Sequence, residues 1–93
     1  MNNFILILTH HQDMEHGWVE VPATLMDRLG ILEQVSEYSY FSFDRQAYYL
    51  EEDGDASLLI KALKSQGLEY VLKSKNYASR APMRRMARVG SAE

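Results

Sequence analysis

Residues 18–31 read WVEVPATLMDRLGI, and this stretch decides the fold because it changes from a strand pattern to a helix pattern. Val19 and Val21 favour extended backbone, and Pro22 disfavours helical backbone at the residue before it. Pro22 itself suits the first turn of a helix. An apolar face at positions i, i+1 and i+4 follows, made by Leu25, Met26 and Leu29. We therefore expect a strand that runs directly into a helix.

Glycine is expected to end this helix and a second one further along the chain. With Gly30 in the left-handed conformation, Ile31 can pack back onto Met26. Gly67 follows a second apolar stripe in the same way, and Leu68 can pack back there. The stripe of the second helix consists of Leu58, Leu59, Ala62 and Leu63.

Four further segments predict strands around the two helices. Residues 4–9 form a short apolar run, and residues 68–73 alternate apolar and charged side chains. Aromatic residues at 38–43 and 47–51 flank a short polar link, which predicts a hairpin. The resulting order ββαββαβ predicts an α+β fold, a single antiparallel sheet of four to five strands with two helices on one face. If the first strand is peripheral, the remainder forms a split βαβ core.

Charge is divided unevenly along the chain. Residues 1–60 hold eleven acidic and two basic side chains, whereas residues 61–93 hold eight basic and two acidic ones. We expect residues 1–76 to form the domain and residues 77–93 to form a basic tail that is flexible or docked on a partner. The tail could also fold back on the acidic surface, and Pro82 could open a helical turn within it.

The composition excludes several classes of protein. No cysteine is present, which excludes disulfides, a thiolate nucleophile and cysteine-rich zinc modules. The N-terminal apolar run is too short for a signal peptide or a membrane span, so we expect a cytoplasmic protein that does not contact membranes. No glycine-rich phosphate loop or nucleophile motif occurs. The sequence therefore favours a non-enzymatic protein without a cofactor.

Two polar clusters are weak candidates for metal or catalytic sites. His10, His11 and His16 supply metal-ligating nitrogens, but adjacent histidines on a strand point in opposite directions. A solvated hairpin loop is the favoured interpretation, and we assign no metal ligands. The acidic run at residues 51–55 is interpreted as the start of the second helix, where Asp53 or Asp55 would cap free N–H groups.

Four short segments resemble a pattern found in small uncharacterised proteins of bacterial accessory genomes, phages and plasmids. They are residues 16–22 (HGWVEVP), 29–31 (LGI), 38–40 (YSY) and 49–56 (YLEEDGDA). The resemblance spans about half of the chain and brings no settled activity. It implies a protein of mobile-element type that modulates another system by binding.

The preferred hypothesis is a binding or modulator protein that acts on a protein partner, or on a second copy as a homodimer. Arginine and tyrosine are common in interface cores, and the predicted partner-binding residues are Arg80, Arg84, Arg85, Arg88, Tyr48 and Tyr49. The first alternative is a nucleic-acid accessory protein whose tail arginines contact phosphate. The second alternative is a metal-binding protein that uses the histidine loop.

Overall fold

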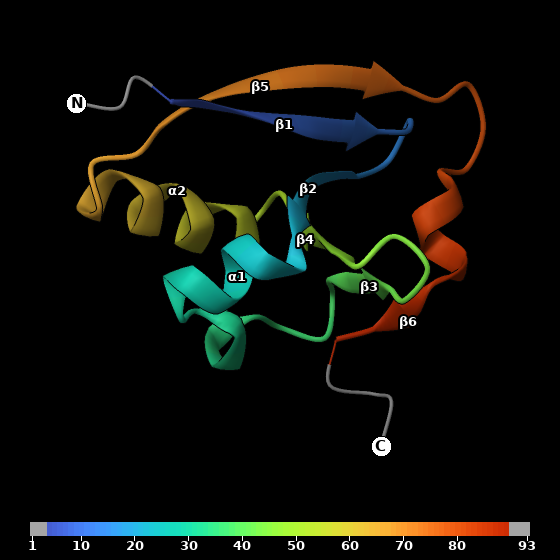
Figure 1. Cartoon of the computed structure of the whole chain (residues 1–93). Coiled ribbons are helices and arrows are strands. Elements are labelled where there is room, and N and C mark those ends of the chain that lie inside the picture. Colours follow the sequence, from blue (N-terminus) through green and yellow to red (C-terminus); the bar gives the residue numbers. More distant parts are fainter. Residues whose placement is uncertain (1–3, 90–93) are drawn as a thin grey trace.

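A computed structural model describes residues 4–89, and its centre is one six-stranded sheet with two α-helices on one face (Figure 1). The predicted α+β fold is confirmed. The elements in chain order are β1 (Ile5–Gln12), β2 (Gly17–Pro22), α1 (Ala23–Leu29), the short 3-10 helix η1 (Leu32–Gln34), β3 (Tyr40–Ser42), β4 (Ala47–Glu51), α2 (Asp55–Ser65), β5 (Glu69–Asn76), the 3-10 helix η2 (Pro82–Arg85) and β6 (Ala87–Arg88). No helix in this part of the chain is long and apolar enough to cross a membrane.

The sheet is mixed, which differs from the antiparallel sheet expected from the sequence. Its strand order is β5-β1-β2-β4-β3-β6, and β5 pairs with β1 in parallel while the other pairs are antiparallel. The parallel pair arises because α2 carries the chain from β4 to the far edge of the sheet, where β5 runs in the direction of β1. The split βαβ core was expected only if the first strand is peripheral, and β1 instead lies inside the sheet, between β5 and β2.

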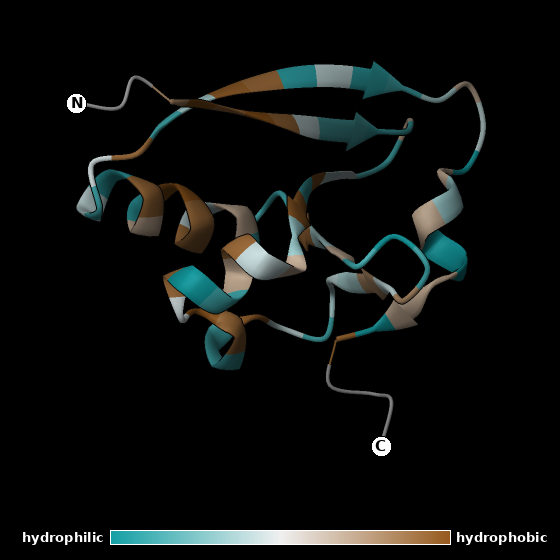
Figure 2. Cartoon of the chain, in the orientation of Figure 1, coloured by the Kyte–Doolittle hydropathy of each residue, from teal (hydrophilic) through white to brown (hydrophobic). Residues whose placement is uncertain are grey.

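The main core lies between the sheet and the two helices, on what we call the helix face. Leu8, Val19, Val21 and Leu50 of the sheet meet the stripes of α1 and α2 there, and Figure 2 shows hydrophobic residues along the inner sides of both helices. Both predicted glycine stops occur. Gly30 has φ 67° and donates its N–H to Met26 O (3.0 Å), while Gly67 has φ 67° and lets Leu68 N–H reach Leu63 O (2.9 Å).

The start of α2 differs from the expected cap. Gly54 occupies the N-cap position, and no side chain caps the helix. Instead, the buried carboxylate of Asp55 accepts hydrogen bonds from Ser36 N–H (3.0 Å), Ser36 Oγ–H (2.7 Å) and Ser39 Oγ–H (2.5 Å). Asp55 therefore joins the start of α2 to the segment between η1 and β3.

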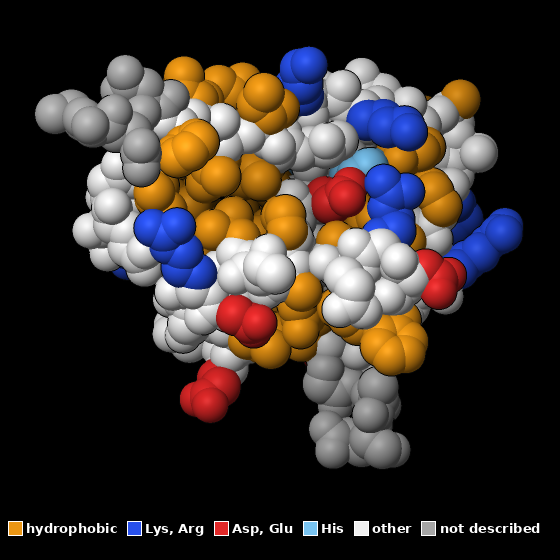
Figure 3. Space-filling view, in the orientation of Figure 1, with side chains coloured by type: hydrophobic (Ala, Val, Ile, Leu, Met, Phe, Trp, Pro, Cys, Tyr) orange, Lys and Arg blue, Asp and Glu red, His pale blue; other side chains and the backbone are white. Residues whose placement is uncertain are grey.

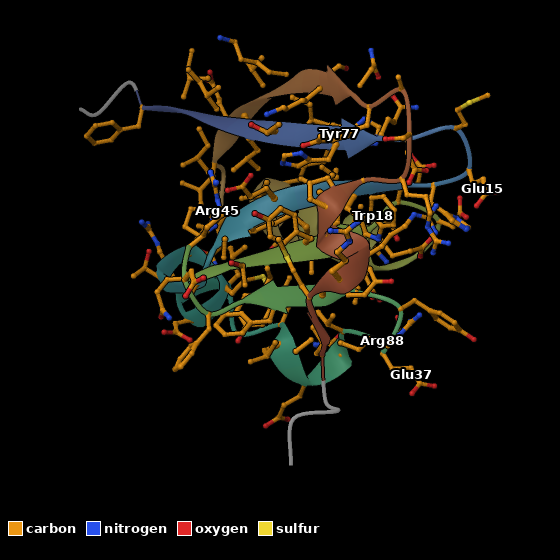
Figure 4. All side chains as sticks on the ribbon, turned by 90° about the vertical axis from the view of Figure 1, so that its right-hand side faces the viewer. Glu15, Trp18, Glu37, Arg45, Tyr77 and Arg88 are labelled. Atoms are coloured by element: carbon orange, nitrogen blue, oxygen red, sulfur yellow. The ribbon has the colours of Figure 1, made fainter. Side chains whose placement is uncertain are left out.

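Residues 77–89, which we call the C-terminal segment, lie across the opposite face of the sheet (Figure 4). Ala81 and Met83 are 2% and 1% exposed and pack with Trp18 and Tyr49 in a second core. Pro82 opens a 3-10 helix, as expected, and β6 pairs with β3 at the edge. Where the sequence suggested a flexible or partner-docked tail, the described part of it is thus a packed layer of the domain. Residues 90–93 lie outside the described residues.

Candidate binding pocket under the C-terminal segment

The opposite face of the sheet presents a transverse row of polar and aromatic side chains. Strand register places these residues side by side, because facing residues of paired strands project on the same face. The row runs through Lys73, Thr9, Glu20, Tyr49, Tyr40 and Arg88, one from each strand. Residues 77–86 of the C-terminal segment cover the middle of this row, at Tyr49 and Tyr40.

Asp13, in the turn between β1 and β2, fixes the C-terminal segment to the sheet. Its carboxylate accepts a bidentate pair of hydrogen bonds from Arg84, from Nε at 2.6 Å and from Nη2 at 3.0 Å. It also accepts the backbone N–H groups of Glu15, His16 and Ala81 at 2.9–3.0 Å. Asp13 therefore organises its own turn and the start of η2 at once.

The Asp13–Arg84 pair is covered from solvent although it lies near the molecular surface. The side chains are 3% and 12% exposed, respectively. The hydrogen bonds from Arg84 hold the pKa of the Asp13 carboxyl well below its usual range, and the same bonds raise the pKa of the Arg84 guanidinium. Both groups are charged at neutral pH, so the positive charge of Arg84 is compensated inside the molecule.

A second contact to the segment runs through His11, which is 6% exposed. Its Nε2–H donates to Glu20 Oε1 at 2.7 Å, and its Nδ1 accepts from the Tyr77 hydroxyl at 2.7 Å. A carboxylate only accepts, so Nε2 carries a proton, and in the neutral ring Nδ1 then accepts from the Tyr77 hydroxyl. Arg45 lies on the outer side of Glu20, at 3.7 Å from Nε to Oε2.

The order phenol, imidazole, carboxylate is that of a nucleophile, its base and an orienting group. Burial raises the pKa of Tyr77 and the negative charge of Glu20 raises it further, so the hydroxyl keeps its proton at neutral pH. The network ties the start of the C-terminal segment to β1 through side chains that are distant along the chain.

A pocket of about 380 Å³ opens beside η2. Its apolar wall consists of the rings of Trp18, Tyr38 and Tyr40. The Arg84 guanidinium lies 5.2 Å from the centre of the Trp18 ring, and that of Arg88 lies 5.2 Å from the centre of the Tyr40 ring. Figure 4 shows Trp18 beneath η2 and Arg88 further along the segment. The pocket therefore exists because the C-terminal segment packs against these rings.

The polar edge of the pocket comes from His16, Glu51 and Asp53. Glu51 is half-buried, and its Oε2 accepts the backbone N–H of Asp53 at 2.8 Å. Burial raises the pKa of Glu51. No ion pair within residues 4–89 involves Glu51 or Asp53. We call the whole site the aromatic pocket; it is lined by His16, Trp18, Tyr38, Tyr40, Glu51, Asp53, Arg84 and Arg88.

The predicted arginines are divided between internal and exposed roles. Arg84 is held by Asp13, and Arg88 donates from Nη1 to the backbone oxygen of Glu37 at 3.1 Å. Arg80, Arg85 and Arg88 are exposed. Arg84 and Arg88 line the aromatic pocket together, and Arg80 and Arg84 line a second pocket beside Asp13.

The predicted tyrosines lie on different faces of β4. Tyr49 is 2% exposed beneath the C-terminal segment, so a partner cannot reach it in this conformation. Tyr48 is half-buried on the helix face and packs against Phe41, with ring centres 4.7 Å apart. The exposed tyrosine of the site is Tyr38, which is 63% exposed. It belongs to the aromatic segment 38–43, but no sequence pattern distinguished it from the other aromatic residues of that segment as a binding residue.

The three histidines do not meet. His10 donates from Nε2 to Glu52 Oε1 at 3.0 Å on one face, His11 binds Glu20 and Tyr77 on the other, and His16 lies beside Trp18. In the described range, no three His, Cys, Asp or Glu side chains group so that they could hold a metal ion.

Comparisons with protein-family models, curated proteins and solved structures gave no match for this chain.

Proposed function

We propose that the protein binds another protein and that the aromatic pocket receives a basic side chain, an arginine, from that partner. Glu51 carries the proposal. It is a half-buried carboxylate at the pocket edge, and no basic side chain among residues 4–89 forms an ion pair with it. A desolvated carboxylate gains most from a neutralising partner, because burial of an unpaired charge is unfavourable.

The rings of the pocket support the same choice of ligand. A guanidinium is attracted to an aromatic face, and Trp18 and Tyr40 each already hold one from the chain itself. Tyr38 offers a third, exposed ring. Asp13 compensates Arg84, and no basic side chain among residues 4–89 forms an ion pair with Glu51 or Asp53, the two carboxylates of the pocket.

The composition of the pocket is also that of an interface hot spot. Trp, Tyr and Arg dominate such positions, where a partner inserts an anchoring side chain into a preformed pocket. A volume of about 380 Å³ lies at the lower end of the range for ligand pockets and suits a single side chain.

The proposal is tested by affinity capture with matched variants. Tagged wild-type protein and the variants Tyr38→Ala, Glu51→Gln and Phe43→Ala are incubated with lysate of the native cell, with and without nuclease treatment, and retained proteins are identified by mass spectrometry. Phe43 is the matched control because it is an 80% exposed aromatic outside the pocket. We expect a partner that wild type and Phe43→Ala retain and that the two pocket variants lose.

Loss of a hot-spot side chain weakens binding by about 2 kcal/mol or more, which is about 30-fold. Equal retention by all four proteins would contradict a role of the pocket. Partners that disappear with nuclease would instead support the nucleic-acid alternative, with the exposed Arg80 and Arg85 as the phosphate contacts.

A further inference from the structure

The strand β5 leaves one long side of the sheet open. It is the outermost strand, and within residues 4–89 it pairs only with β1. It has eight residues, and all of them except Tyr70 are exposed. A row of backbone N–H and C=O groups on such an edge is a template for another strand, and natural edges of this length are usually shortened, bulged or covered.

Apolar side chains accompany this edge. Ile5, Ile7 and Val71 are 54%, 64% and 48% exposed on the face opposite the helices, and Leu72 is 40% exposed on the helix face. Figure 2 shows the first halves of β1 and β5 as hydrophobic, and Figure 3 shows hydrophobic side chains gathered along the top of the molecule, where these strands lie. Exposed apolar patches of this kind mark interaction surfaces.

We propose that two copies of the chain join through their β5 strands, antiparallel and with Val71 opposite Val71 of the second copy. This register places each Glu69 opposite Lys73 of the other copy, twice over by symmetry. It also places each Tyr70 opposite Leu72. The edge is therefore complementary to itself in charge and in apolar contact, as an interface with two-fold symmetry requires.

The rows of side chains continue across the proposed interface. Ile7 pairs with Val71 within one chain, so one face would carry the continuous row Ile7, Val71, Val71, Ile7. On the helix face, Leu6 pairs with Tyr70 and Leu8 with Leu72. Two rows would cross the interface on this face. Each runs from Leu6 and Tyr70 of one copy to Leu72 and Leu8 of the other. The two apolar surfaces would thus merge into one over twelve strands.

Neighbouring registers are poorer. Facing residues of an antiparallel pair project on the same face of the sheet. In a symmetric pair, one residue therefore lies on the two-fold axis and faces its own copy, and each alternative register places a different residue of β5 there. With Leu72 at the centre, Val71 faces Lys73 and Tyr70 faces Ser74. With Lys73 at the centre, two like charges face each other, which is destabilising. Of these three registers, only the one centred on Val71 satisfies charge and apolar contact together.

Charge reversal tests the interface. The molar mass of wild type in solution should be twice 10.7 kDa, measured by light scattering over a dilution series. Glu69→Lys and Lys73→Glu should each raise the dimer dissociation constant about tenfold or more, because each removes two pairs and adds two like-charge contacts. The double variant Glu69→Lys/Lys73→Glu should restore wild-type association. Lys61→Glu, an exposed reversal on α2, is the matched control and should leave association unchanged.

Cysteine cross-linking tests the register, because the chain contains no cysteine of its own. Under mild oxidation, Val71→Cys should give a disulfide-linked dimer, since the two Cα atoms at the symmetry axis lie about 4.5–5.5 Å apart. Leu72→Cys should cross-link weakly. The reverse preference, or rescue of Glu69→Lys by Lys75→Glu and not by Lys73→Glu, would overturn the register.

A wild-type protein that stays at 10.7 kDa up to millimolar concentration would overturn the dimer. So would a dimer that none of the β5 variants affects. This interface shares no residue with the aromatic pocket, so the proposed function and the dimer can fail independently.

Discussion

Replacement of Arg84 by methionine should loosen the C-terminal segment and destabilise the whole domain. The substitution keeps most of the apolar stem and removes the guanidinium. Asp13 would then remain charged and 3% exposed, with three backbone N–H groups but no cation. The substitution would also remove the positive charge of Arg84 that lies 5.2 Å from the ring centre of Trp18.

The magnitude follows from where the pair lies. Exposed ion pairs contribute about 0–1 kcal/mol, and breaking a fully buried one costs about 3–5 kcal/mol. The pair is covered but close to the surface, so we expect the free energy of unfolding to fall by about 2–4 kcal/mol. A domain of 93 residues has about 5–14 kcal/mol in total, so the loss is a large fraction of it.

Urea unfolding at pH 7 measures this loss, followed by far-UV circular dichroism and by fluorescence. Trp18 is the only tryptophan, so fluorescence reports on the second core beneath η2. Arg80→Met serves as the control because Arg80 is exposed on the same segment. Asp13→Asn/Arg84→Met should cost less than the sum of its single variants, because the two side chains interact directly.

A loss below about 0.5 kcal/mol for Arg84→Met would match an exposed ion pair. Together with additive behaviour of the double variant, it would refute the conclusion that Asp13 fixes the C-terminal segment.

Three other contacts give separate predictions. The pKa of Asp13 is depressed from its ordinary 3.8 in the folded state, so its contribution to stability is present above that pH and is lost as the pH falls. The difference in unfolding free energy between wild type and Asp13→Asn should therefore shrink from pH 5 to about pH 2. Tyr77→Phe leaves His11 Nδ1 buried without its donor and should cost about 1–3 kcal/mol in urea unfolding, whereas no change would contradict the contact. Gly67→Ala should cost about 1–2 kcal/mol because φ is 67°, although no atom lies within 4 Å of the added Cβ; a neutral result in thermal unfolding would show that the backbone relaxes there.

Much of the fold follows from local patterns in the sequence. The change from strand to helix at Pro22 and the stops at Gly30 and Gly67 depend on residues close in sequence, and these predictions are confirmed. The position of β5 beside β1 does not follow from such patterns. Its alternation indicates a strand, but the neighbour of that strand is fixed by the path of α2 across the sheet.

The candidate site was less accessible to sequence reasoning because its contacts are distant along the chain. Asp13 and Arg84 are 71 residues apart, and His11 and Tyr77 are 66 apart. The one usable signal was local. Met83 lies one residue after Pro82 within an arginine-rich run, and an apolar residue at a helical turn there indicates a packed segment and not a solvated tail.

The aromatic pocket is tested most directly by a titration that needs no knowledge of the partner. Protein labelled with ¹⁵N is titrated with N-acetyl-arginine amide and, in parallel, with the citrulline analogue, which has the same shape without the charge. We expect saturable shifts of the Trp18 indole signal and of the Tyr38 and Glu51 amide signals with the arginine probe alone, and loss of these shifts in Glu51→Gln. No shifts, or equal shifts with both probes, would contradict recognition of a basic side chain at this pocket.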